Sequence, residues 1–382
     1  MPGIYIHIPF CKQACSYCNF HFSTLIKYRE PVLRALAAEI HLRKNYLDEK
    51  GNVPQVSSIY FGGGTPSLLS GGELGKLLSD VYRDFRVAPD AEITLEANAD
   101  DLDEKKFSEL QAAGVNRLSI GVQSFFDEDL RLLKRIHSGD QAYRAVAGAL
   151  AAGFENLSVD LIYGIPSLSH ERWEQNLMKV ISLGIPHLSC YALTVEPKTE
   201  LSYRVKKNKA ELPGDEHTAQ QFTMLMQLAK EKKYLHYEIS NFCLEGHYAR
   251  HNSSYWKREH YLGIGPSAHS YNGRSRQWNV AGNMTYVRSI EKGIIPCEKE
   301  ELTSRQKYNE YIMTSLRTMW GCSPAFIREN YGSNIFNTFI AEVKKISGSG
   351  MLSEKDDTFF LTEKGKLFAD KIISDLFQLH EN

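Results

Sequence analysis

Residues 5–18 read Tyr5-Ile-His-Ile-Pro-Phe-Cys11-Lys-Gln-Ala-Cys15-Ser-Tyr-Cys18, and this stretch is the most informative of the chain. Its three cysteines can bind three irons of a [4Fe–4S] cube, which normally takes four cysteine thiolates. The fourth iron is then left for another ligand, and a cofactor can supply it. Two alternatives stay open: a zinc site, which usually needs a second CxxC or paired histidines, and cysteines that are simply buried.

The composition is that of a globular protein of one large domain and one smaller domain. The chain has 382 residues, of which 42% are hydrophobic and 24% charged. A formal charge of −1 gives no general attraction to nucleic acid or anionic lipid. The sequence has an odd number of cysteines, seven, its start Met-Pro-Gly lacks a basic segment followed by an apolar one, and no apolar run approaches the length of a membrane span. We therefore expect the reducing cytoplasm.

Short β-rich runs alternate with helical patterns over the first two thirds of the chain. Repeated strand–helix units predict a parallel sheet wrapped by helices, and six or seven units predict an incomplete (β/α) barrel of the α/β class. The predicted strands are Ile4–Ile8, Ser57–Phe61, Glu92–Glu96, Arg117–Val122, Leu157–Ile162, His187–Ala192 and Tyr234–Ile239.

Polar residues recur near the carboxyl ends of these strands, where the functional residues of (β/α) barrels gather. A single polar residue there is more often a turn residue, but the recurrence favours a site at one mouth of the barrel. The set comprises Cys11–Cys18, Gly62-Gly-Gly-Thr-Pro66, Glu96, Gln123 and Asp160. The glycine run is either a tight turn or a place where the backbone approaches a ligand closely. It lacks the Gly-Lys-Ser/Thr of a phosphate loop.

The cysteine motif and its neighbours resemble the signature of radical S-adenosylmethionine proteins and, more narrowly, of the oxygen-independent coproporphyrinogen III oxidase group. The resemblance implies a [4Fe–4S] cluster on Cys11, Cys15 and Cys18 and a bound S-adenosylmethionine that is cleaved reductively. It also implies these cofactor-binding positions: Tyr5, Tyr17, Gly63, Gly64, Thr65, Glu96, Gln123, Arg135, Asp160 and Ile264.

Within that set, the resemblance gives the positions different roles. The glycine run receives the amino group of the methionine part, and Glu96 suits the paired ribose hydroxyls. Arg135 is a carboxylate clamp, unless it belongs to the solvated face of a helix over 131–135. The aromatic or apolar walls are Tyr5, Tyr17 and Ile264.

Two departures from the oxidase pattern argue against oxidase activity. The oxidases carry a further cysteine two positions after the third, where this chain has Phe20. They also have a long N-terminal extension, whereas here the first strand is predicted from about Ile4. Whether the chain is an enzyme at all stays open.

The stretch His251-Asn252-Ser-Ser-Tyr255-Trp256 resembles a motif of the haem chaperone branch of this family. A histidine can ligate haem iron and aromatic rings can cover a porphyrin face. The resemblance thus implies haem binding at His251, Asn252, Tyr255 and Trp256. The alternative is that both aromatic residues pack in the core. The axial ligand stays open, with further candidates in His247, Tyr248, His260, Tyr261, His269 and Cys243.

The C-terminal part resembles a winged helix-turn-helix module. An amphipathic helix is predicted over Thr303–Trp320, a second helix is capped by Ser323 before Pro324, and a hairpin precedes a last helix ending at Leu379. No basic stripe is visible, so packing or partner contact is favoured over DNA binding. We predict a barrel over 1–245, a haem-motif and connecting region over 246–300, and a winged-helix-like domain over 301–382.

The function that the resemblance implies is that of a haem chaperone, which carries the cluster and S-adenosylmethionine. Its partners would be haem-accepting apoproteins, with membrane-bound respiratory enzymes as one class, and an electron donor if the cluster is reduced; nucleic acid is not expected. The alternatives are a radical oxidase acting on a tetrapyrrole and a radical enzyme with another substrate. A homodimer stays open.

Overall fold

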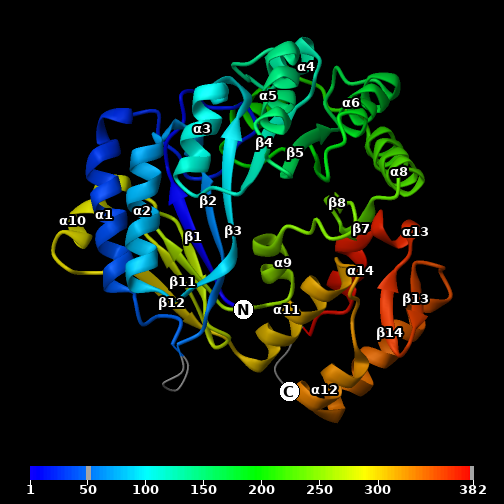
Figure 1. Ribbon diagram of the computed structural model, residues 1–382. Coiled ribbons are helices and arrows are strands. Elements are labelled where there is room, and N and C mark those ends of the chain that lie inside the picture. The colour runs from blue at the N-terminus through cyan, green and yellow to red at the C-terminus, as the bar shows by residue number, and fades with distance from the viewer. Residues whose placement is uncertain (49–52, 379–382) are drawn as a thin grey trace.

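A mixed sheet forms the larger part of the molecule (Figure 1). The structure is a computed structural model that describes residues 1–48 and 53–378. Within these residues the strand order is β12-β11-β10-β9-β1-β2-β3-β4-β5-β6-β8-β7. The strands are β1 Gly3–Ile8, β2 Val56–Gly63, β3 Val87–Asn98, β4 Arg117–Gln123, β5 Asn156–Tyr163, β6 His187–Ala192, β7 Leu235–Glu238, β8 Asn241–Cys243, β9 Tyr261–Ile264, β10 His269–Tyr271, β11 Ser275–Asn279 and β12 Cys297–Glu301.

The six strands from β1 to β6 run parallel, as the alternating pattern predicted. Each of the first six predicted strands falls within an observed one, and the α/β prediction is confirmed. The seventh, Tyr234–Ile239, is wrong as a further parallel unit. Residues Leu235–Glu238 form β7, which a tight turn connects to β8, and the two strands pair antiparallel. Glu238 stabilises the turn because it accepts hydrogen bonds from Ser240 N and from Asn241 Nδ2.

Helices cover the outer face of the parallel strands (Figure 1). Their apolar residues pack on strand residues such as Ile4, Ile6 and Ile8, which are fully buried. Capping boxes at Ser70 and Ser138 satisfy the first amides of α2 and α5. The helical elements of this part are η1 Ile26–Tyr28, α1 Arg29–Leu42, η2 Pro66–Leu68, α2 Gly71–Asp84, η3 Ala99–Asp101, α3 Glu104–Ala112, α4 Asp127–Leu132, α5 Gly139–Ala151, α6 His170–Ser182, α7 Glu200–Lys206, α8 Asp215–Glu231, α9 Arg250–Trp256 and α10 Asn283–Ile290. Of these, α9 lies on the inner face of the sheet, where His251 stacks on Tyr60 (Figure 1).

The C-terminal part has a hydrophobic core of its own, which runs from Tyr308 to Leu376. Its elements are α11 Ser304–Leu316, α12 Pro324–Ser347, β13 Leu352–Lys355, β14 Thr358–Leu361, α13 Glu363–Lys366 and α14 Ala369–Asp375. The predicted hairpin and the Ser323 cap, which accepts from Phe326 N, are both present. The last predicted helix is broken into α13 and α14, and its end at Leu379 lies outside the described residues.

The helix predicted over Thr303–Trp320 is shorter in the structure. It ends at Leu316, so Met319 is exposed rather than part of the buried face. The segment after the helix instead attaches the C-terminal part to the sheet: Met319 N donates to Tyr237 O, and Ile239 N donates to Arg317 O. Backbone bonds to β7 thus hold α11 beside the last strands of the sheet.

Residues 261–301, within the predicted connecting region and at its border, contribute β9 to β12 to the same sheet as β1. The three-part division of the chain stays a prediction. None of the helices within residues 1–48 and 53–378 combines the length and apolar composition needed to cross a bilayer.

Candidate functional site

A cavity of about 450 Å³ opens at the carboxyl ends of the parallel strands. It brings together most of the residues that the sequence assigned to the cluster and to S-adenosylmethionine. These are Cys11, Cys15, Cys18, Tyr17, Gly63, Gly64, Thr65, Glu96, Gln123, Arg135 and Asp160. They come from the loops and ends that follow β1 to β5, so one mouth of the sheet holds them all.

The three cysteines of the motif face this cavity, as ligands of a shared iron–sulfur cube would. Cys11 Sγ accepts from Thr65 Oγ1 and Cys15 Sγ from Arg135 Nη1, each over 3.4 Å. Burial raises the pKa of the Cys11 thiol to about 11, so iron binding would release its proton. In the described residues no three His, Cys, Asp or Glu side chains converge as ligands of one metal ion do. The cysteines of a cube each bind a different iron and need no common point.

The glycine run lies directly against the start of the cysteine loop. Ile8 pairs with Gly63, and Gly64 N donates to Ile8 O over 2.9 Å. A Cβ at Gly63 would stand 2.3 Å from the His7 ring, and one at Gly64 would stand 2.6 Å from Phe10 O. Gly63 also has a φ of +105°, which disfavours side chains. Only glycine fits here, and the run leaves the backbone open to the cavity.

Two half-buried carboxyl groups, Glu96 and Asp160, line the cavity, and Glu96 lies directly beside the glycine run. Burial raises the pKa of Glu96 to about 7 and that of Asp160 to about 6. Glu96 accepts from Tyr60 OH over 2.8 Å and from Gly63 N over 3.1 Å. A carboxylate has about four acceptor positions, so two remain for a ribose.

Gln123 and Arg135 complete the polar wall of the cavity. Gln123 has a φ of +69° at an irregularity of the β4–β5 pairing, a strained geometry typical of functional positions. Arg135 does not lie on a solvated helix face, because its Nη2 donates to Asn98 Oδ1 over 2.6 Å and to Gly121 O over 2.9 Å. Its Nε is buried without a hydrogen bond among the described residues, which leaves one donor for a ligand.

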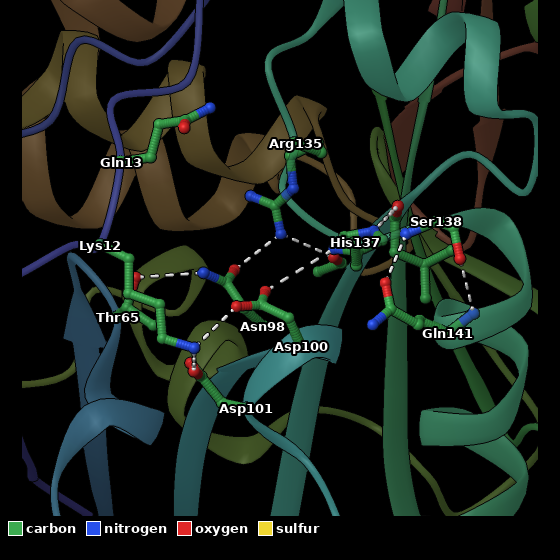
Figure 2. A network of polar contacts seen from close by, with 12 residues as sticks. Lys12, Gln13, Thr65, Asn98, Asp100, Asp101, Arg135, His137, Ser138 and Gln141 are labelled. Atoms are coloured by element: carbon green, nitrogen blue, oxygen red, sulfur yellow. Dashed lines mark hydrogen bonds and ion pairs between the residues drawn. The ribbon is translucent and has the colours of Figure 1, made fainter.

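Figure 2 shows the polar network that fixes the cluster loop to the end of β3. Lys12, next to Cys11, points to Asp100, with an Nζ–Oδ2 distance of 2.8 Å, and also pairs with Asp101. Burial acts to raise the pKa of Asp100, but the nearby His137 ring and the hydrogen bond from Lys12 hold it well below its usual range. The carboxylate is therefore charged, and the loop is held by an ion pair beside the thiols.

Two predicted wall residues of this cavity lie elsewhere. Ile264 is fully buried in the core on β9, where it pairs with Ile6. Tyr5 lines a second, larger cavity, because residues of β1 alternate in direction and its ring passes behind Gly62. Neither residue lines the smaller cavity, so their role as cofactor walls stays a prediction; the motif shows residue types and not the direction of side chains.

The larger cavity measures about 890 Å³ and lies between the two ends of the sheet and α11. Pockets for cofactors and drug-sized ligands occupy roughly 300–1,000 Å³. Among its lining residues are seven aromatic side chains that contribute broad apolar faces: Tyr5, Phe20, Tyr191, Tyr255, Trp256, Tyr261 and Tyr271. A flat, largely apolar ligand suits this composition.

His251 does not line this cavity, whereas Asn252, Tyr255 and Trp256 of the same motif do. His251 is 1% exposed, and its two ring nitrogens are bonded to Ser58 Oγ over 2.9 Å and to Tyr255 OH over 2.8 Å. Burial lowers its pKa to about 3, so the ring is neutral. Neither ring nitrogen of His251 has a lone pair free to ligate iron. The ring lies behind Tyr255 and outside the cavity.

The two cavities share a wall and are joined by a chain of contacts. Asn19, Phe20 and Tyr191 line both of them. Behind this wall, the Tyr60 hydroxyl binds Glu96, and the Tyr60 ring stacks on His251 at 5.1 Å between centroids. His251 in turn bonds Tyr255. Side chains of the smaller cavity are thus connected with a wall of the larger one.

Of the other proposed axial ligands, His269 and Tyr261 line the larger cavity. The His269 ring has no hydrogen bond to another described residue and stacks on Trp278 at 6.1 Å. Cys243 is fully buried on β8 and lines neither cavity. Sequence reasoning missed Arg258, Arg276 and Glu310, which also line the larger cavity. No local motif could have found them, because they come together only through the packing of α11 on the sheet.

Comparisons with known proteins agree with this geometry. Residues 5–180 match the family model of the radical SAM superfamily, and residues 302–368 match that of the HemN C-terminal domain. The heme chaperone HemW of Bacillus subtilis is 35% identical over 97% of this chain and 98% of its own length. HemW of Escherichia coli is 33% identical over 97% of both. The structure of coproporphyrinogen III oxidase (HemN) from Escherichia coli superposes with a TM-score of 0.85 at 22% identity, covering 99% of this chain and 91% of HemN. That likeness shows the fold.

Proposed function

The chain belongs to the HemW family of radical S-adenosylmethionine proteins, and from this premise we propose that it binds haem in the larger cavity and delivers it to acceptor proteins. The observation that carries the proposal is the cavity of about 890 Å³, into which the motif residues Asn252, Tyr255 and Trp256 project. Its aromatic lining can hold a porphyrin by its faces.

His269 is the histidine of the larger cavity whose ring makes no hydrogen bond to another described residue, and we take it as the axial ligand. Three histidines line it: His7, His21 and His269. Both ring nitrogens of His7 are bonded, to Tyr5 OH and His21 O, and Nε2 of His21 is bonded to Asn283 Oδ1. Burial lowers the pKa of His269, which favours the neutral ring that metal binding requires. His251 then has a positioning role, since it orients the Tyr255 hydroxyl from behind.

The smaller cavity fits the [4Fe–4S] cluster and S-adenosylmethionine that the family implies. Cys11, Cys15 and Cys18 would hold the cluster, which supplies an electron for reductive chemistry when bound. Glu96 would accept from the ribose, and Arg135 and the open backbone of the glycine run would receive the methionine part. The network of Lys12 with Asp100 and Asp101 holds the cluster loop in place.

Oxidase chemistry is the second candidate, and the fold shared with HemN is what favours it. Against it stands Phe20, which occupies the position of the further oxidase cysteine and is 68% exposed between the two cavities. An apolar ring at this point can donate no hydrogen bond and no proton.

The test uses one anaerobically reconstituted sample for three measurements. The expected results are a saturable Soret change on titration with haem, transfer of that haem to a haem-free respiratory enzyme, and no consumption of coproporphyrinogen III with S-adenosylmethionine and reductant. Haem binding without any transfer would contradict delivery to acceptor proteins and would leave only haem binding supported. Robust decarboxylation of coproporphyrinogen III would favour the second candidate.

A further inference from the structure

Three arginines from different segments line the larger cavity: Arg258 after α9, Arg276 on β11 and Arg317 after α11. Arg276 Nη2 lies 3.0 Å from Glu310 Oε1, and Arg317 pairs with Asp370. Arg258 makes no ion pair within residues 1–48 and 53–378. A guanidinium is always charged and presents a planar fork of donors that matches a carboxylate.

Arg258 is held in place by aromatic rings rather than by a carboxylate. Its guanidinium lies over the rings of Tyr311, at 4.7 Å, and Phe326, at 5.0 Å, and its Nη1 donates to Tyr331 OH over 3.3 Å. It follows the motif residue Trp256 by two positions. Stacking fixes the plane of the fork at the cavity wall and leaves other donors for a ligand.

The Arg276–Glu310 pair bridges β11 and α11 along the cavity wall. The Glu310 side chain is 14% exposed. Burial raises the pKa of Glu310, although Arg276 and Arg258 act to lower it. Arg276 Nε is buried without a hydrogen bond in the described part of the chain. Arg276 thus has a resident carboxylate partner and an unused donor at the same time.

We infer that Arg258 and Arg276 bind the two propionate carboxylates of haem. Glu310 then forms its ion pair with Arg276 only while the ligand is absent. This inference rests on the proposed function and gives the ligand an orientation, with its carboxylate edge toward α11. A guanidinium left unpaired in a half-buried wall is costly. When the ligand leaves, the ion pair between Glu310 and Arg276 forms again, so Arg276 is not left unpaired. Release of the ligand therefore avoids that cost, as a protein that transfers its ligand requires.

The experiment compares haem with its dimethyl ester, in which both carboxylates are masked, as ligands of the full-length, cluster-loaded protein. Arg276→Met and Glu310→Gln remove the same ion pair, so a merely structural role predicts the same change in both. We expect Arg276→Met to weaken haem binding about tenfold, as the loss of one charge-assisted pair would. Glu310→Gln should instead tighten it. Arg258→Met should also weaken binding of haem, and none of the three should change binding of the ester.

Arg274→Met, on the exposed turn before β11, is the matched control for the loss of one positive charge. It should leave both affinities unchanged. If Arg276→Met and Glu310→Gln shift haem affinity in the same direction, or if the variants weaken binding of the ester as much as binding of haem, the inference is overturned while the proposed function stands. If the unmodified protein shows no saturable haem binding, both are overturned.

Discussion

The two cavities differ in how the chain builds them. The smaller one is assembled from the ends of successive parallel strands, so its residues follow one another in the sequence in the order of the strands. The larger one takes residues from β1, β7, α9, β10 and β11 of the sheet part and is closed by α11 of the C-terminal part. The first is a property of the repeating strand–helix unit, and the second is a property of the tertiary fold.

This difference predicts that the two cavities can be disabled separately, and cluster loss is the largest expected effect. Cys15→Ala should remove most of the iron and brown absorbance of the reconstituted protein, because the cube loses one of its three thiolates. Cys297→Ala should not, since Cys297 lies on β12 away from the cavity. Iron analysis after reconstitution measures both, and a full cluster complement in Cys15→Ala would contradict the assignment.

The glycine run gives the next largest effect. In Gly63→Ala the new Cβ would meet the His7 ring at 2.3 Å in a backbone conformation that costs about 1–3 kcal/mol for a side chain. We expect S-adenosylmethionine affinity, measured by equilibrium dialysis, to fall more than about tenfold, as 1.4 kcal/mol does. Gly72→Ala, where nothing lies within 4 Å, is the control; equal losses in the two variants would refute a specific role for the run.

Substitutions of His251 and His269 distinguish a structural role from ligation of the haem iron in the larger cavity. His251→Ala leaves the hydroxyls of Ser58 and Tyr255 without their partner in a buried space, and should lower the free energy of unfolding by about 2–4 kcal/mol. His269→Ala should change the Soret spectrum of the haem complex and leave stability nearly unchanged. Urea unfolding and a haem titration test both. A His251→Ala protein of full stability that loses only the axial signature would reverse the two roles.

The ionisation of Glu96 gives the smallest effect. Its pKa in the folded protein is about 7 against an ordinary value of 4.5, so the folded state holds a proton that the unfolded state releases. The contribution of Glu96 to stability is therefore lost as pH rises from 4.5 through 7. Glu96→Gln, which cannot ionise, should be more stable than the unmodified protein at pH 8 by about 1–3 kcal/mol. Urea unfolding of the cluster-free protein at pH 5 and 8 measures this.

The control for that measurement is Glu30→Gln, on an exposed position of α1. It should show the same dependence of stability on pH as the unmodified protein. A Glu96→Gln protein that is no more stable at pH 8 than the unmodified one would mean that Glu96 stays charged in the folded state.

The sequence could predict the smaller cavity because strand ends, glycine runs and cysteine spacing are local signals. It could not show that Tyr5 points away from this cavity or that Ile264 is in the core, because side-chain direction depends on the register of β1 with β2 and β9. The same holds for His251, whose type suggested a ligand and whose two bonds make it a support. The ion pair of Arg276 with Glu310 joins segments that are far apart in the sequence, and no local pattern in either segment predicts it.

The most direct test of the haem site is a haem titration of a Tyr255→Ala/Trp256→Ala double variant beside the unmodified protein, with cluster iron measured on both samples. Both side chains line the larger cavity, and neither lines the smaller one. We predict that haem affinity falls at least about tenfold, as expected when two aromatic contacts are lost, while the cluster content stays the same. An unchanged affinity and Soret spectrum in a variant with an intact cluster would show that haem does not bind in the larger cavity.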